Sequence, residues 1–297
     1  MKNKTIAILG SKGSFHEAAA NKYFGEEVTY SYCPTFGEVF ASLKRGIVDF
    51  GITAIENTVA GTILPNYAMM RESELKIVGE VYLPIQQNLL SLRGQTIADL
   101  KEVHSHPMAL LQCSKFCEQY PHIKLVEASD TATSAKRIAE EHLLNVGAIA
   151  STYVANLYGL QVLKEGIETH KKNFTRFLII ADVLKNTDTN KPVNKASICF
   201  NVVHEKGSLA KVLMLLADNN INLTKIQSLP LVGKEWEYYI HIDMEFNDFN
   251  NYKNALLLIK PSLNEFKILG EYSCGEKTSI PISNAEHSIN HSEPIIT

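Results

Sequence analysis

The segment Asp49-Phe50-Gly51-Ile52-Thr53-Ala54-Ile55-Glu56-Asn57-Thr58-Val59-Ala60-Gly61 decides how this chain folds. It continues an apolar, strand-like run, Val48–Ile52, and it places the polar residues Glu56, Asn57 and Thr58 at the far end of that strand. In open α/β sheets, ligands bind at the carboxyl ends of the strands, so the segment predicts both a sheet of this kind and a candidate site. A helix cap formed by Asn57 or Thr58 is an equally good interpretation of the same residues.

Short apolar runs alternate with helical stretches on both sides of this segment, from Thr5 to about Ile180, as in a doubly wound α/β domain. Helices are expected in most of the gaps, for instance at Glu38–Arg45 and Thr131–Glu141. Further strands are expected at Thr5–Leu9, Lys76–Leu83, Glu102–His104, Lys124–Ala128, Val146–Ile149 and Thr175–Ile180.

The polar, turn-rich residues 186–195 are typical of a linker between a first domain, residues 1–185, and a second domain, residues 196–275. The second domain has a different order of elements, βαββαβ, which is typical of a ferredoxin-like fold. Residues 276–297 have the composition of a disordered tail. The expected elements of the second domain are Ala196–Val203, Ser208–Asn219, Asn222–Leu229, Glu235–Met244, Asn250–Ile259 and Phe266–Ser273.

The composition excludes several classes of protein. The formal net charge of -3, without a basic block, argues against a nucleic-acid partner. No apolar run reaches the length of a membrane helix or of a signal-peptide core, so no membrane is expected and the cytoplasm is the expected location. The five cysteines form no C-x-x-C pair and are expected to be reduced. No third ligand accompanies His104 and His106, so no metal site is expected.

Three further segments carry polar residues in suggestive positions. In Gly10-Ser11-Lys12-Gly13-Ser14-Phe15-His16-Glu17, the glycines allow a tight turn whose amides suit a carboxylate or a phosphate, although a purely structural turn explains them as well. The spacing fits neither of the glycine-rich nucleotide-binding motifs.

Next along the chain, Ser105 is expected to cap a helix whose first turn tolerates Pro107. Gln112 lies seven residues further, so both side chains are expected on nearly the same face, toward one cleft. Capping alone is the simpler interpretation of Ser105.

In Asn173-Phe174-Thr175-Arg176-Phe177, strand alternation places Asn173, Thr175 and Phe177 on one face and Arg176 on the other. An amide, a hydroxyl and a ring together suit an uncharged pocket for a cyclic substrate. An ordinary polar start of a strand is the alternative.

Taken in order, these motifs resemble the prephenate dehydratase family over about residues 5 to 275. The motifs are Gly10-x-x-Gly13-Ser14-Phe15, Ile55-Glu56-Asn57-Thr58, Ser105-His106-Pro107 with Gln112-Cys113, Asp130-Thr131-Ala132 and Asn173-x-Thr175-Arg176-Phe177. The second domain, with Gly207-Ser208-Leu209 and the stretch from Asn222 to Pro230, is similar to the ACT regulatory domain that follows the catalytic domain in that family.

The resemblance implies a catalytic domain of two lobes, about residues 1–80 with 165–185 and about 81–164, similar to periplasmic-binding-protein folds. It implies Thr175 as the catalytic hydroxyl, in a cleft lined by Asn57, Ser105, Gln112 and Thr131. It also implies a homodimer or homotetramer without a metal or an organic cofactor. The other expected substrate-binding residues are Gly13, Ser14, Phe15, Glu56, Thr58, Asn173, Arg176 and Phe177.

The implied reaction converts prephenate into phenylpyruvate, water and carbon dioxide, and formation of the aromatic ring drives it. Thr175 is expected to hydrogen-bond the departing hydroxyl rather than to ionise. Neutral donors such as Asn57, Ser105 and Gln112 suit the departing carboxylate, because an ion pair would stabilise the ground state. The surviving carboxylate is expected on the amides of Gly13–Ser14.

The chain departs from the family pattern at a few positions. Gln227-Ser228-Leu229-Pro230 replaces the usual Glu-Ser-Arg-Pro of the ACT domain, so one acid and one arginine are missing. L-phenylalanine is still the expected effector, at Gly207, Ser208 and Leu209 together with residues 227–230. Met108 and Gln86-Gln87-Asn88 differ from the common residues as well.

Two other functions fit the same residues. Arogenate dehydratase acts on a substrate that differs from prephenate only away from the leaving group. A non-enzymatic sensor, with a two-lobed solute-binding fold joined to an ACT domain, would bind a ligand without turnover.

Overall fold

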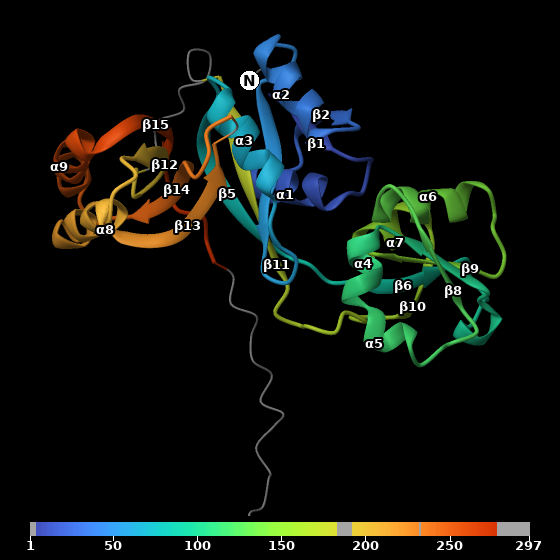
Figure 1. Ribbon diagram of the computed structural model, residues 1–297. Helices are drawn as coiled ribbons and strands as arrows, with labels where there is room; N and C mark the ends of the chain where they lie inside the picture. The colour runs from blue at the N-terminus through green and yellow to red at the C-terminus, as the bar shows by residue number, and fades with distance from the viewer. Residues whose placement is uncertain (1–3, 183–191, 232, 278–297) are drawn as a thin grey trace, which may run out of the picture.

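The computed structural model describes residues 4–182, 192–231 and 233–277 of the chain. Its strands form two separate sheets (Figure 1). The larger has ten strands in the order β13-β14-β12-β15-β5-β11-β3-β1-β2, with β4 paired to β3, and the smaller has five in the order β10-β6-β9-β7-β8. The α/β class predicted from the sequence is confirmed.

The N-terminal half of the larger sheet is covered by helices on both faces. Its strands are β1 (Lys4–Leu9), β2 (Val28–Cys33), β3 (Phe50–Asn57), β4 (Gly61–Thr62), β5 (Lys76–Pro84) and β11 (Phe174–Ala181). Helix α1 (Phe15–Phe24) packs on the face that includes Phe177 and Ile179. Helices α2 (Phe36–Lys44) and α3 (Leu64–Glu72) pack on the face that includes Leu178 and Ile180. Strand β11 runs antiparallel to both of its neighbours, β3 and β5.

The five-stranded sheet belongs to a lobe that lies apart from this half in Figure 1. It contains β6 (Asn88–Ser91), β7 (Glu102–Ser105), β8 (Lys124–Glu127), β9 (Val146–Ala150) and β10 (Gln161–Lys164). A short 3-10 helix, η1 (Ile97–Asp99), precedes β7. The helices of the lobe are α4 (Pro107–Gln112), α5 (Ser114–Cys117), α6 (Thr131–Glu140) and α7 (Thr152–Tyr158).

The chain crosses between the two lobes twice, through residues 85–87 and 165–173, and the two crossings are hydrogen-bonded to each other. The Ile167 amide donates to the Gln87 carbonyl at 2.8 Å, and the Gln87 amide donates to the buried Glu168 carboxylate at 2.9 Å. The Ile85 amide donates to the carbonyl of Asn173 at 2.8 Å. These bonds hold the crossings side by side where the lobes meet.

The C-terminal part has the predicted βαββαβ order, and we refer to it as the C-terminal unit. Its elements are β12 (Lys195–Val202), α8 (Ser208–Asp218), β13 (Asn222–Pro230), β14 (Tyr238–Glu245), α9 (Phe249–Ile259), η2 (Lys260–Ser262) and β15 (Leu263–Tyr272). Helices α8 and α9 cover one face through a core that includes Phe200, Leu216 and Tyr252.

The C-terminal unit joins the N-terminal half through a close contact between two strands. Strand β15 pairs with β5 at Gly270 and Ile77. A side chain at Gly270 would overlap the carbonyl oxygen of Ile77, so glycine allows this approach. The C-terminal unit and the N-terminal half therefore share one sheet.

Several boundaries differ from the sequence-based expectation: β3 extends to Asn57 rather than ending at Ile52, and β15 begins at Leu263 rather than Phe266. The strands β2, β4, β6 and β10 were not expected. Strand β14 begins at Tyr238 rather than Glu235, because Trp236 has a φ of 64°, a left-handed conformation that a strand does not allow. Lys195, expected at the end of the linker, is the first residue of β12 and is fully buried. The rest of the predicted linker up to residue 191, and the predicted tail beyond residue 277, lie outside the described residues.

Candidate active site

Four polar side chains meet where the two lobes join, and we call them the polar cluster: Asn57, Gln112, Asn173 and Thr175. Asn57 ends β3, Gln112 ends α4, and Asn173 and Thr175 lie at the start of β11. The Asn57 amide nitrogen donates to the Thr175 hydroxyl at 3.0 Å and to the Asn173 side-chain oxygen at 2.7 Å. The Asn173 amide donates to Gln112 at 3.0 Å, and Gln112 donates back to Asn57 at 3.4 Å. The structure therefore brings together four residues that the sequence analysis expected in one site.

A tight turn fixes the orientation of Asn57. Its side-chain oxygen accepts from the amides of Val59 at 2.9 Å and Ala60 at 2.7 Å. Because the oxygen is held by the turn, the amide nitrogen faces β11. Asn57 thus caps a turn and not a helix, since α3 begins only at Leu64.

The Thr175 hydroxyl is the one reactive group of the polar cluster. It accepts a hydrogen bond from Asn57, and within the described part of the chain no protein atom accepts its proton. Its side chain is 8% exposed, so solvent competes little for that proton. The hydroxyl can therefore donate to an oxygen atom of a bound molecule.

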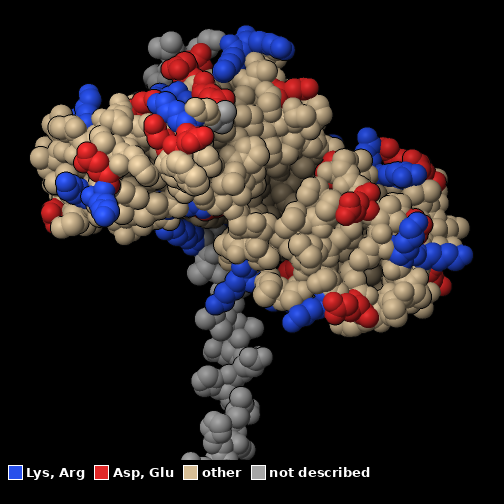
Figure 2. All heavy atoms as spheres, in the orientation of Figure 1, with Lys and Arg blue, Asp and Glu red and all other residues tan. Residues whose placement is uncertain are grey.

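The surface around the join is suited to a small ligand. Figure 2 shows it hollowed between the N-terminal half and the five-stranded lobe, with few charged side chains at the hollow. The polar cluster itself contains amides and a hydroxyl but no charged group. The site can therefore hydrogen-bond a ligand without forming an ion pair with it.

Ser105 does not occupy the predicted position. It is the last residue of β7, and His106 caps α4 instead through its ring nitrogen. The Ser105 hydroxyl is fully buried and donates to the carbonyl of Ile149 at 2.6 Å. The predicted shared helical face with Gln112 was wrong, because the strand continues to Ser105 and the helix has only six residues.

The loop of Gly13 and Ser14 is occupied by its own hydrogen bonds. The Gly13 amide donates to the Glu17 carboxylate at 2.9 Å, and the Ser14 amide donates to the carbonyl of Ser11 at 3.0 Å. The Ser14 hydroxyl caps α1. A side chain at Gly13 would lie 2.9 Å from Val154 of the other lobe. The loop is thus a close contact between lobes, and its two amides are not free for a ligand carboxylate.

The remaining expected site residues lie at different places in the structure. Thr58 accepts from the amide of Phe174 at 2.9 Å and so ties the end of β3 to β11. Thr131 is the first residue of α6, near the lobe contact in which Asp130 accepts from Ser11 at 3.4 Å. Phe15 packs against the core under α1. Phe177 is 1% exposed and belongs to the same core, so its ring packs inside the protein and does not line an open pocket.

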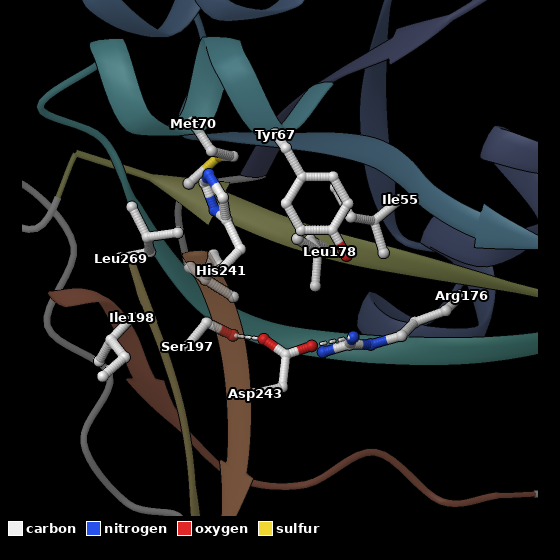
Figure 3. A pocket seen from close by; sticks show the side chains of 11 residues that line it. Ile55, Tyr67, Met70, Arg176, Leu178, Ser197, Ile198, His241, Asp243 and Leu269 are labelled. Atoms are coloured by element: carbon white, nitrogen blue, oxygen red, sulfur yellow. Dashed lines mark hydrogen bonds and ion pairs between the residues drawn. The ribbon is translucent and has the colours of Figure 1, made fainter. Parts of the chain in front are cut away.

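Arg176 and Glu56 point away from the polar cluster. Arg176 is 2% exposed, and its guanidinium donates to Glu80 at 2.7 Å, to the Tyr272 hydroxyl at 3.0 Å and to Asp243 (Figure 3). Strand alternation puts this side chain on the face toward the C-terminal unit. This placement fits a role in holding the strand and not the expected substrate contact, because the donors of Arg176 are already bonded. Glu56 pairs with Lys225 on the same side.

Sequence reasoning missed this buried group of charges. Glu80 lies in an otherwise apolar part of β5, and Asp243 lies between Ile242 and Met244 on β14; such acids are rarely buried without a partner. Burial opposes the charged form of Asp243, but Arg176, Ser197 and Lys195 together outweigh it and lower the pKa of that carboxyl below its ordinary value. An acidic residue within an apolar strand was the signal in the sequence that could have indicated this buried group.

His241 lies beside these charges and makes stability depend on pH. Burial, with a smaller effect of Arg71, lowers its pKa from 6.5 to about 4. Neither ring nitrogen has a hydrogen-bond partner among the described residues. Because the folded-state pKa lies below the unfolded value, the unfolded chain binds the proton first. Stability is then complete above pH 6.5 and is lost as the pH falls toward 4.

We expect His241→Phe to remove this pH dependence. Between pH 7 and pH 5 the parent protein should lose about 2 kcal/mol of unfolding free energy through His241, and the variant should not. Urea unfolding at both pH values measures the difference. The exposed His122, changed to phenylalanine, is the matched control. Equal pH dependence of the parent and His241→Phe would contradict the expectation.

The residues expected to bind an effector lie in the C-terminal unit. Gly207, with a φ of 84°, precedes α8, which begins with Ser208 and Leu209. Gln227, Ser228 and Pro230 lie on β13, an edge strand of the larger sheet. Leu229 is 8% exposed and packs toward the N-terminal half.

The described residues contain no group of three or more His, Cys, Asp or Glu side chains placed to hold a metal ion. None of their helices combines the length and the apolar character that crossing a bilayer requires.

Two α/β lobes with an uncharged polar cluster at their junction, followed by a βαββαβ unit, define a class of two-lobed α/β proteins with an appended small domain. The prephenate dehydratase family model matches residues 6–184, more than half of the chain. The chain belongs to the prephenate dehydratase family, a family of lyases, as its motifs predicted.

Individual relatives support this assignment. A bifunctional chorismate mutase/prephenate dehydratase from Aquifex aeolicus is 36% identical over 270 residues, which are 90% of this chain and 73% of that protein. Arogenate dehydratase 2 from Petunia hybrida is 36% identical over 282 residues, 90% of this chain and 71% of that protein. The crystal structure of a prephenate dehydratase from Arthrobacter aurescens in complex with L-Phe has a TM-score of 0.80 and 26% identity, and the match covers 91% of this chain and 89% of that one.

Proposed function

We propose that this protein catalyses the decarboxylating dehydration of prephenate to phenylpyruvate, a step of L-phenylalanine biosynthesis. The observation that carries the proposal is the Thr175 hydroxyl, which is held by Asn57 at 3.0 Å and has a proton to donate. Membership of the prephenate dehydratase family supports the same activity.

The reaction needs little beyond a hydrogen bond to the departing oxygen. The bond between the ring and its carboxylate breaks, carbon dioxide leaves, and the electron pair moves into the ring as the C–O bond breaks. The departing hydroxide takes up a proton and becomes water. We assign Thr175 to donate to that oxygen, where negative charge develops. A threonine hydroxyl is a weak acid, so it hydrogen-bonds or relays a proton rather than ionising.

The absence of charge in the polar cluster suits the other departing group. A cation beside the ring carboxylate would stabilise the substrate more than the transition state, because the charge leaves with carbon dioxide. We assign Gln112 to contact this part of the substrate, because its amide nitrogen makes only one hydrogen bond within the described residues, at 3.4 Å. Asn57, whose amide nitrogen already donates to Asn173 and Thr175, orients Thr175. Thr58 and Thr131 complete the proposed site. We assign no substrate contact to Ser105, Gly13 and Ser14, because their own donors are already bonded.

Arogenate is the alternative substrate. The relative named arogenate dehydratase 2 is as similar to this chain as the bifunctional prephenate enzyme is. The two acids differ only in an amino or a keto group on the side chain, away from the reacting ring. Prephenate is proposed here because the family model and the relative from Aquifex aeolicus are both named for prephenate dehydratase.

The test is to incubate the purified protein with each acid and to follow the ultraviolet absorbance of the aromatic product. Faster turnover of prephenate supports the proposal. Faster turnover of arogenate would mean that the same site acts on arogenate, the amino form of the substrate. Tight binding of either acid without any product would instead favour a non-enzymatic sensor.

We further propose that the C-terminal unit is an ACT domain that binds L-phenylalanine, and that the protein works as a homodimer or homotetramer in the cytoplasm. The βαββαβ order supports the first part, and β13, an edge strand with Ile226 half exposed, offers a surface for a second copy. All five cysteines are free, as a reducing compartment would keep them.

L-phenylalanine is expected to bind and to slow prephenate turnover. The Ser208 amide already donates to the carbonyl of Glu205 at 3.2 Å, so the amides of Gly207 and Leu209 at the start of α8 are the ones that suit the effector carboxylate. Gln227 and Leu229 remove two charges common at this position. Titration calorimetry and the turnover assay are to be run on the same preparation, with D-phenylalanine as the control. Neither heat nor inhibition at millimolar L-phenylalanine would contradict this regulation.

A further inference from the structure

Neighbouring residues on two central strands face two different parts of the molecule. Thr175 pairs with Asn57 across β11 and β3, and Arg176 pairs with Glu56. Thr175 and Asn57 belong to the polar cluster, whereas Arg176 and Glu56 reach toward the C-terminal unit. A single peptide bond therefore separates each proposed active-site residue from a contact to that unit.

Besides Glu56 on β3, which accepts from its guanidinium at 3.5 Å, the contacts of Arg176 come from three further strands. Glu80 belongs to β5, Asp243 to β14 and Tyr272 to β15, and Figure 3 shows Asp243 between the guanidinium and Ser197. Glu80 also accepts from Lys195 at 2.9 Å, so two cations and two carboxylates balance in a buried group. Losing one partner would leave an uncompensated charge in the interior, which makes this arrangement rigid.

Glu56 is tied to the same unit by a second pair. Its carboxylate accepts from the Lys225 ammonium on β13, and Lys225 also donates to Thr62 at 2.8 Å. Lys225 lies two residues before Gln227 on that strand, within the stretch proposed to bind the effector. A displacement of β13 would therefore move Glu56, which is adjacent to Asn57. A displacement of β14 would move Arg176, which is adjacent to Thr175.

We propose that Arg176 and Glu56 are positioning residues through which the C-terminal unit holds Thr175 and Asn57 in their working geometry. Hydrogen-bonded catalytic groups tolerate displacements of only about 0.5 Å. The first residues of β11 are held on both sides by pairing with β3 and β5, and Arg176 adds the anchor to the C-terminal unit. The activity part of this inference rests on the proposed function, whereas the structural part does not.

The experiment compares two variants that release these residues with one that does not. Asp243→Asn removes the charge that pairs with Arg176, and Lys225→Met releases Glu56. Lys267→Met is the matched control, because Lys267 crosses the same interface but donates to the carbonyls of Arg71 and Ser73, at the end of α3. Lys225 is partly exposed, so its variant remains informative if Asp243→Asn does not fold.

Hydrogen–deuterium exchange reports the geometry without any substrate. Peptides that cover residues 55–60 and 173–177 should exchange about tenfold faster in Lys225→Met and Asp243→Asn than in the parent, and at the parent rate in Lys267→Met. Turnover of prephenate should follow, with kcat on the order of tenfold lower and KM within about twofold of the parent value.

The outcomes separate this inference from the proposed function. A parent protein that does not turn over prephenate contradicts the proposed function, and the exchange data then decide the coupling alone. If exchange in both peptides matches the control variant, the inference is overturned. In an active parent, unchanged kcat in Lys225→Met overturns it as well.

Discussion

Replacing Thr175 by valine is expected to lower kcat for prephenate by on the order of 100-fold to 1,000-fold, with little change in KM. Valine keeps the shape of the side chain and removes only the hydroxyl, the group proposed to hydrogen-bond the departing oxygen. Because that bond strengthens as negative charge develops, its loss raises the barrier more than it weakens substrate binding. Steady-state kinetics on the purified variant measures the effect.

Thr175→Ser is the control for this change. Serine keeps the hydroxyl, so the donor from Asn57 at 3.0 Å retains its acceptor. We expect kcat within about tenfold of the parent value, since serine loses only the methyl group that restricts its rotamer. Near-normal kcat in a folded Thr175→Val protein would refute the role assigned to this residue.

Asn57→Asp is expected to lower kcat/KM by on the order of 1,000-fold. The change keeps the oxygen that the amides of Val59 and Ala60 hold, so the turn after β3 should survive. It replaces the amide nitrogen by an oxygen that faces the Asn173 oxygen, 2.7 Å away, and the Thr175 hydroxyl. It also places a negative charge beside an anionic substrate.

Asn57→Ala separates these two effects. Alanine removes the donor without adding charge, so we expect its loss of kcat/KM to be on the order of tenfold smaller than that of Asn57→Asp. Circular dichroism and thermal unfolding show whether both variants keep the fold. An Asn57→Asp protein with kcat/KM within tenfold of the parent would exclude Asn57 from the site.

Part of the candidate site followed from strand alternation, which predicted a strand end at Asn57 and a shared face for Asn173 and Thr175. It was the resemblance to the prephenate dehydratase family that placed these residues in one cleft. The prediction for Ser105 was wrong because a strand end and a helix cap look alike in sequence. The prediction for the amides of Gly13 and Ser14 was wrong because their acceptors, Glu17 in the first turn of α1 and Ser11 in the loop, lie within four residues of them.

The sequence by itself determined the α/β class, the βαββαβ order and the opposite directions of Thr175 and Arg176, because periodicity and alternation are local properties of the chain. Only the tertiary structure decided the partner of each polar group. Asn57 meets Thr175 across 118 positions of sequence, and Arg176 meets Asp243 across 67. Such pairings depend on how distant elements pack, and no local pattern records them.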